Sequence, residues 1–269
     1  MSETPARLWR DLVAASPAHP FVTSYDTSGN RVELSPATLD NWVSKTANML
    51  VDGFGTQPGD RVAVALPLHW QSLVWLLSCW SVGAVAVPVD GDAFPDGAQT
   101  AVADAARLEA ALDSGAEEVV GTSLHPLGLP LKEVPPLVLD YTTEVRAHGD
   151  HFAPYALDAD AAALEEPGRS WTGTELVAAG RERAKAWGLT GRERVGVVAA
   201  PGTPLAVLGG GAALLMAAVA AASPLVLAEG GPGEVSELAQ RLAMERATAV
   251  LDTSGSGVAA VAEGLRELR

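Results

Sequence analysis

The chain has 269 residues, of which 48% are hydrophobic and 19% are charged. This composition supports a large buried core and excludes global disorder. The formal net charge is −15, which repels nucleic acid and anionic membranes unless a local basic patch is present. The sequence contains no such patch, so we expect neither nucleic acid nor a membrane as a partner.

The first residues and the cysteine content indicate a cytoplasmic protein. The N-terminus has no basic segment followed by an apolar core, so no signal peptide is predicted. The single cysteine, Cys79, cannot form an internal disulfide, which fits a reducing compartment. Because it lies in an apolar helical stretch, we interpret it as a small core residue and not as a nucleophile.

The first part of the chain alternates predicted helices and strands after an N-terminal helix. Ser35 and Pro36 begin an amphipathic helix, as an N-cap residue followed by proline predicts. Apolar runs then predict strands at 61–66, 84–89, 117–121 and 135–140, with helices at 69–82 and 101–113 between them. Such alternation is typical of βαβ units and parallel sheets.

The segment 141–170 is acidic, rich in alanine and weakly periodic. Its breakers are Pro154, Pro167 and Gly168, so we interpret the segment as a linker or exposed loop. The predicted units are therefore residues 1–155 and residues 156–269.

The second unit repeats the pattern of the first. Thr172 and Glu175 have the spacing of a capping box. Strands are predicted at 194–200, 225–228 and 247–251, with helices at 205–220, 235–242 and 258–268. The uncharged stretch 205–228 is long enough to span a bilayer, but Ser223-Pro224 interrupts it, so a buried helix followed by a buried strand is the better interpretation.

Two segments of the chain are similar to each other. Gly59-Asp-Arg-Val-Ala-Val-Ala-Leu-Pro67 and Arg192-Glu-Arg-Val-Gly-Val-Val-Ala-Ala-Pro201 both follow an amphipathic run and precede an apolar stretch. A repeat of this length predicts two supersecondary units with similar folds. The predicted fold class is α/β, with two mainly parallel sheets flanked by helices.

Five ordered segments of the first unit form a recognisable series: Pro20–Tyr25, Glu33–Ser35, Leu39–Leu50, Gly59–Pro67 and Gly83–Pro88. This series resembles the N-terminal region of the adenylate-forming superfamily, in the form of a small, truncated bacterial relative. The superfamily includes acyl-CoA synthetases, adenylation domains of nonribosomal synthetases and luciferases. The resemblance implies a large lobe of two similar subdomains.

The resemblance also implies a chemistry, and the sequence departs from it. Family members join a carboxylate to AMP from ATP with Mg²⁺, using a Ser/Thr/Gly-rich phosphate loop that ends in Pro-Lys. This loop should fall at 158–172, where the chain instead carries the carboxylates of Asp158, Asp160, Glu165 and Glu166. Clustered carboxylates repel phosphate groups.

Other expected motifs are missing as well. The lysines of the chain are Lys45, Lys132 and Lys185, and none stands in a phosphate loop. The Tyr-Gly-x-Thr-Glu segment, the ribose-binding Asp and a C-terminal domain carrying a catalytic lysine are not found. We expect no catalytic residue and no complete ligase.

A candidate anion site remains at Thr253, Ser254, Gly255, Ser256 and Gly257. These residues follow a predicted strand and precede a predicted helix, a geometry that binds anions through free N–H groups. An ordinary helix N-cap at Thr253 or Ser254, with the glycines forming the turn, is the interpretation that we favour. His125, His148 and His151 lack the context of a metal site, so we predict no metal.

Three functional hypotheses follow. The leading one is a non-catalytic relative of acyl-CoA synthetases without a cofactor, acting in protein interaction or ligand binding. An exposed apolar surface would then serve self-association or a partner protein. The alternatives are a ligase component completed in trans, which would require ATP and Mg²⁺, and a small acyl- or nucleotide-binding module.

Overall fold

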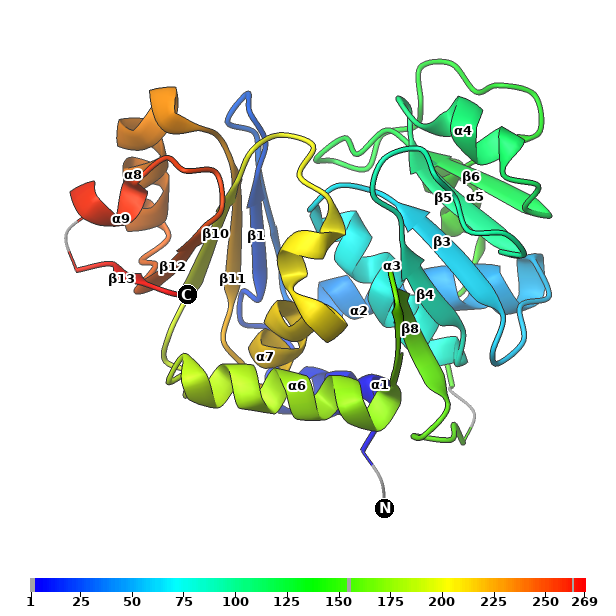
Figure 1. The fold of residues 1–269 in the computed structure, drawn as a ribbon, viewed down its shortest axis with the longest axis horizontal. Helices are drawn as coiled ribbons and strands as arrows, with labels where there is room; N and C mark the ends of the chain where they lie inside the picture. Colours follow the sequence, from blue (N-terminus) through cyan, green and yellow to red (C-terminus); the bar gives the residue numbers. More distant parts are fainter. Residues whose placement is uncertain (1–2, 154–155, 263) are drawn as a thin grey trace.

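The protein contains two β-sheets that face each other across a layer of helices (Figure 1). The computed structural model describes residues 3–153, 156–262 and 264–269. Within these ranges one sheet has six strands in the order β13-β12-β10-β11-β1-β2, and the other has seven in the order β7-β6-β5-β3-β4-β8-β9. The predicted α/β class with two mainly parallel sheets is confirmed.

The helices and strands have the following bounds. The six-stranded sheet contains β1 (Val22–Tyr25), β2 (Arg31–Leu34), β10 (Val195–Ala199), β11 (Leu225–Glu229), β12 (Ala249–Asp252) and β13 (Arg266–Glu267). The seven-stranded sheet contains β3 (Arg61–Ala65), β4 (Val85–Pro88), β5 (Thr100–Asp104), β6 (Glu118–Thr122), β7 (Val138–Asp140), β8 (Ala162–Glu166) and β9 (Arg169–Thr172). The helices are α1 (Pro5–Ala15), α2 (Pro36–Asn48), α3 (Trp70–Val82), α4 (Leu108–Asp113), α5 (Tyr141–Glu144), α6 (Gly173–Ala186), α7 (Ala213–Ala221), α8 (Val235–Met244) and α9 (Val258–Val261).

The two helices with predicted caps begin where the sequence places them. The Ser35 hydroxyl accepts a hydrogen bond from the Thr38 N–H at 3.2 Å, and Pro36 occupies the first turn of α2. At α6, Thr172 and Glu175 form the reciprocal bonds of a capping box. These contacts satisfy N–H groups that a helix start leaves open.

The strands bury side chains on both of their faces. Val195 and Val197 of β10 face the helical layer, whereas Val198 faces α8 on the opposite side. In Figure 1, α8 and α9 cover this outer face, and α1, α2, α3, α6 and α7 lie between the sheets. Parallel strands covered on both faces read as continuous apolar runs, which explains why β3 and β10 are recognisable in the sequence.

The predicted helix at 101–113 is wrong in its first half. Residues Thr100–Asp104 form β5, which pairs in parallel with both β3 and β6, and α4 is limited to Leu108–Asp113. The alanines of this stretch favour a helix locally. Tertiary pairing overrides that preference because small side chains fit between two covered strands.

The uncharged stretch 205–228 is divided among several elements. It contains 3₁₀ turns at Leu205–Leu208 and Gly210–Ala212, then α7 and β11. The glycines Gly209 and Gly211 have positive φ, which breaks the single helix predicted at 205–220. None of the helices in the described ranges has the length and hydropathy needed to cross a bilayer.

The predicted linker at 141–170 contains regular structure. It holds α5, β8 and the first residues of β9. In addition, each predicted unit contributes strands to the sheet that is formed mainly by the other unit. β1 pairs with β11 of the second unit and carries β2 on its other edge, and β8 pairs with β4 of the first unit. The two sheets therefore exchange strands across the predicted boundary.

Candidate functional site

The segment in which the resemblance predicts a phosphate loop is an antiparallel hairpin. β8 pairs with β9 so that Glu166 stands opposite Arg169, and only Pro167 and Gly168 connect the two strands. Proline has no N–H, so the turn offers a single backbone donor, at Gly168. A triphosphate cradle needs several converging N–H groups, and this connection does not supply them.

The carboxylates of the segment bind groups of the protein itself. Glu165 forms an ion pair with Arg61, with 2.8 Å between the charged atoms. Glu166 accepts hydrogen bonds from the Trp171 indole at 2.7 Å and from the Gly211 N–H at 3.2 Å. The hairpin is thus tied to β3 on one side and to the turn before α7 on the other.

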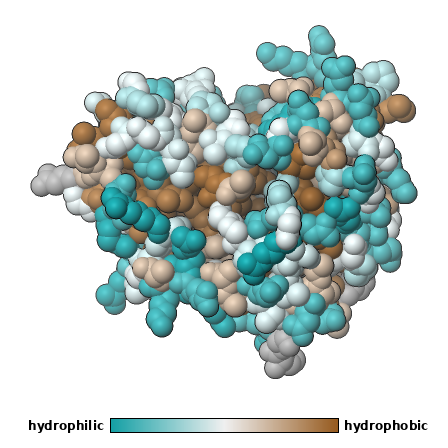
Figure 2. Space-filling model, in the orientation of Figure 1, coloured by the Kyte–Doolittle hydropathy of each residue, from teal (hydrophilic) through white to brown (hydrophobic). Residues whose placement is uncertain are grey.

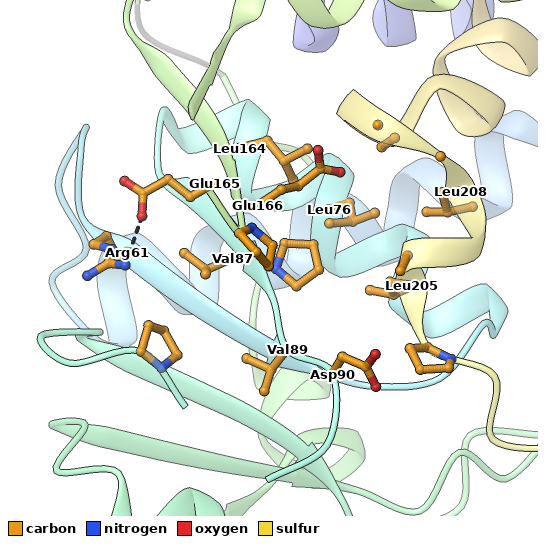
Figure 3. Close-up of a pocket in the computed structure, with 18 of the residues that line it drawn as sticks. Arg61, Leu76, Val87, Val89, Asp90, Leu164, Glu165, Glu166, Leu205 and Leu208 are labelled. Carbon is orange, nitrogen blue, oxygen red and sulfur yellow. Dashed lines mark ion pairs between the residues drawn. The ribbon is translucent and has the colours of Figure 1, made fainter. Parts of the chain in front are cut away.

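A cavity of about 690 Å³ opens between the hairpin and the segment 204–212. Apolar side chains make up most of its wall, and its charged lining residues are Arg61, Asp90, Glu165 and Glu166. Figure 3 shows Val87, Leu76 and Leu205 around the centre of this space. Figure 2 shows brown, hydrophobic surface in the hollow at the middle of this face of the molecule. The volume lies in the range of small-molecule sites.

Trp171 packs against the glycine turn that borders the cavity. An added Cβ on Gly211 would lie 3.0 Å from the Trp171 ring, and one on Gly210 would lie 3.2 Å from it. The Arg169 guanidinium stacks over the Trp171 ring, at 3.3 Å from the ring centroid. Gly210 and Gly211 therefore allow the chain to pack closely against this ring.

The five predicted anion-site residues lie in the loop after β12. The Asp252 carboxylate accepts hydrogen bonds from the N–H groups of Ser254 at 3.0 Å and Gly257 at 2.8 Å, and from the Ser256 hydroxyl. Thr253 donates to the Val198 carbonyl, and no contact of Gly255 to this carboxylate exists among the described bonds. An external anion would have to compete with Asp252 for these donors, and binding there stays a prediction.

The helix predicted at 258–268 is wrong beyond its first turn. α9 ends at Val261, and Arg266–Glu267 form β13 beside β12. Burial raises the pKa of Asp252, but the hydrogen bonds from Ser254, Ser256 and Gly257 outweigh it and lower the pKa below its usual value. The loop therefore holds its own negative charge firmly.

A second, smaller cavity of about 140 Å³ lies at the carboxyl ends of β1, β10 and β11. His69, the N-cap of α3, lines it and accepts the Gln71 N–H through Nδ1 at 3.3 Å. Burial lowers the pKa of His69 to about 3, although the charge of Asp26 acts in the opposite direction. Burial likewise raises the pKa of Glu229 across this cavity, and the charge of Asp26 adds to that shift.

The remaining candidates of the sequence are dispersed. Lys45 donates to the His148 carbonyl at 2.6 Å, Lys132 and Lys185 are exposed, and none of the three lines the larger cavity. Within the described ranges, no group of three or more His, Cys, Asp or Glu residues is placed to hold a metal ion.

Sequence reasoning missed the residues that shape the cavity. Pro167 and Gly168 indicate a break in a linker, although a two-residue turn between two short runs is also a hairpin signal. The sequence marks Arg61 only as the start of a predicted strand and does not distinguish Asp90 from other surface acids. Nothing in the sequence alone relates these residues to Leu205, because they are far apart along the chain and meet only in the folded structure.

Three comparisons place the chain among known proteins. The model of the AMP-binding enzyme family matches residues 9–146. A TIGR03089 family protein of Mycobacterium tuberculosis is 36% identical over 247 residues, which cover 89% of this chain and 94% of that protein. An acetyl-coenzyme A synthetase of Streptomyces coelicolor is 35% identical over 100 residues, covering 37% of this chain and 15% of the synthetase.

Solved structures agree at the level of the fold. An acyl-CoA synthetase of Brucella canis has a TM-score of 0.73 at 17% identity over 94% of this chain and 48% of its own. A long-chain-fatty-acid-CoA ligase of Archaeoglobus fulgidus has a TM-score of 0.72 at 14% identity over 93% of this chain and 52% of its own. The chain thus spans about half the length of these two structures. From the family match and the near full-length relative, the chain belongs to the AMP-binding enzyme family.

Proposed function

We propose that this chain is a non-adenylating member of its family. We further propose that it binds a small apolar molecule in the cavity between the β8–β9 hairpin and the segment 204–212. The observation that carries the first part is the β8–β9 hairpin, in which a two-residue turn stands where the resemblance predicts a phosphate loop. The Glu166 carboxylate accepts a hydrogen bond from the Gly211 N–H. This backbone donor, in the turn before α7, is therefore already bound to a carboxylate of the protein.

The lining of the cavity supports the second part. Burial of apolar ligand surface against Leu76, Val87 and Leu205 would contribute roughly 25 cal/mol per Å² removed from water. Four of the lining residues are charged, as in sites that select a ligand by shape and place it with a few polar contacts.

Two measurements test this function on the purified chain. ATP–pyrophosphate exchange across a panel of carboxylic acids should give no signal above the buffer blank, and exchange by the chain alone would overturn the non-adenylating assignment. Titration with the neutral fluorophore N-phenyl-1-naphthylamine should give saturable fluorescence enhancement. An absence of saturable binding by this probe and by decanol would overturn ligand binding in the cavity.

A pair of tryptophan variants locates the bound probe. Ala206 is exposed on the 3₁₀ turn that lines the cavity, so Ala206→Trp should fill the space and weaken probe binding by about 10-fold or more. Ala178 is exposed on α6 outside the lining, and Ala178→Trp should leave the affinity unchanged. Equal effects of the two variants would place the probe elsewhere.

A partner protein is the second candidate, because apolar side chains are exposed on the segment 124–137. Leu127 is 72% exposed and Leu137 is 90% exposed, and apolar groups gathered on one surface segment are typical of association sites. Light scattering over a range of protein concentrations should show association that Leu127→Ser with Leu137→Ser reduces. A monomer at every concentration would remove self-association as its use.

A further inference from the structure

The cavity between the β8–β9 hairpin and the segment 204–212 combines an apolar wall with an excess of negative charge. Its charged lining residues are three carboxylates and one guanidinium. Arg61 is paired with Glu165 at 2.8 Å, so that pair is balanced. Within the part of the chain that the structure describes, Asp90 and Glu166 form no ion pair with a cation.

Neutral groups donate the hydrogen bonds that hold Glu166 in place. Its donors are the Trp171 indole N–H and the Gly211 backbone N–H, and neither carries a formal charge. Arg169 stands opposite Glu166 in the hairpin, but its guanidinium stacks on the Trp171 ring and its ion pair, at 3.9 Å, is with Glu175. The Glu166 carboxylate is thus oriented by hydrogen bonds from neutral groups and forms no direct ion pair with a described residue.

The two unbalanced carboxylates flank the apolar part of the cavity. Figure 3 shows Asp90 on one side and Glu166 on the other side of Leu76 and Leu205. An apolar ligand that extends from the centre towards either of these residues would therefore have one end near a carboxylate. The like charge of a ligand carboxylate would be repelled there, and a cation would be attracted.

We infer that the ligand of this cavity is a small amphipathic cation, an amine or guanidine attached to an apolar chain or ring. The inference rests on the proposed function, since it specifies the polar end of the molecule bound there. The net charge of −15 favours the same ligands at long range. The volume of about 690 Å³ selects a small molecule over a folded partner.

The test compares three ligands that share one apolar chain. Decylammonium, decanol and decanoate are titrated at concentrations below micelle formation, by displacement of N-phenyl-1-naphthylamine from the full chain. Decylammonium should bind at least about 10-fold more tightly than decanol, and decanoate more weakly than decanol. The preference for the amine should fall as salt is raised, because screening weakens partly exposed charge pairs.

Charge variants separate the cavity from the acidic surface as a whole. Asp90→Asn with Glu166→Gln should bring the affinities of decylammonium and decanol to within about 2-fold. Asp113→Asn with Glu117→Gln makes the same change of net charge at exposed positions outside the lining, and should preserve the preference. An equal loss in both double variants would assign the preference to general attraction and overturn the inference.

The outcomes distinguish this inference from the function on which it rests. Equal binding of the amine and the alcohol, or tighter binding of decanoate, overturns the cationic ligand and leaves an apolar binding site. Failure of decanol and decylammonium alike to displace the probe overturns both. Loss of probe binding in the Asp90→Asn with Glu166→Gln variant is checked by its thermal midpoint, and the single variants then carry the comparison.

Discussion

His69 makes the stability of this protein depend on pH in a defined direction. Burial lowers the pKa of His69 to about 3, against roughly 6.5 in an unfolded chain. Below about pH 6.5 the unfolded state therefore binds a proton that the folded state does not bind. The contribution of His69 to stability is present above this pH and is lost as the pH falls towards 3.

Replacement of His69 by asparagine should remove this dependence and keep the cap of α3. Between about pH 7.5 and pH 5, the free energy of unfolding should fall by about 1–2 kcal/mol more in the wild type than in His69→Asn. Denaturant titrations at both pH values measure the difference. His19→Asn at an exposed position serves as the control, and parallel losses in wild type and His69→Asn would contradict the assignment.

Cys79 should be chemically silent until the protein unfolds. Burial raises the pKa of its thiol to about 12, and the side chain is fully buried within α3. Since the thiolate is the reactive form, a disulfide reagent should label native protein far more slowly than protein in concentrated guanidinium chloride. Ser170→Cys adds an exposed thiol as an internal standard. Labelling of both thiols at one rate would refute the prediction.

The crossing of α6 and α7 depends on a glycine. A Cβ at Gly180 would overlap Met216 Cβ and lie 2.7 Å from the Met216 carbonyl carbon. Gly180→Ala should therefore destabilise the protein by about 2 kcal/mol, since overpacking outweighs the roughly 1 kcal/mol that alanine gains in a helix. Gly233→Ala meets no atom within 4 Å and should be nearly neutral. Thermal unfolding of both variants decides, and a stabilised Gly180→Ala would contradict this packing.

The elements that the sequence predicts well are those whose own residues dictate them. β3 is apolar after Arg61 and β10 is apolar throughout, and α6 begins at a complete capping box, so local signals suffice. β5 and the hairpin β8–β9 are different, because their alanines and charged residues become strands only through pairing with β3 and β4. The candidate cavity is harder still, since its walls come from segments more than a hundred residues apart.

Each of the two sheets contains strands from both predicted units, residues 1–155 and residues 156–269. β1 is hydrogen-bonded between β11 and β2, which adds two strands from the first unit to the sheet of the second. Buried Glu245 reinforces this connection by accepting hydrogen bonds from the Tyr25 hydroxyl at 2.6 Å and from Arg31 at 2.7 Å. Loss of these partners would leave a buried carboxylate with fewer donors, which is costly.

A fragment of residues 156–269 should consequently fail to fold alone. Without β1 it exposes the edge of β11, together with the face of β10 and β11 that packs on the shared helical layer, and exposed edges of this kind aggregate. Circular dichroism and amide NMR dispersion should show no cooperative unfolding for this fragment. Co-expression with residues 1–155 should restore a stable complex, as should a full chain cleaved at an inserted protease site after residue 155. Cooperative unfolding of the isolated fragment would show that the second unit folds autonomously. In that case β1 and β2 would extend a core that is stable without them.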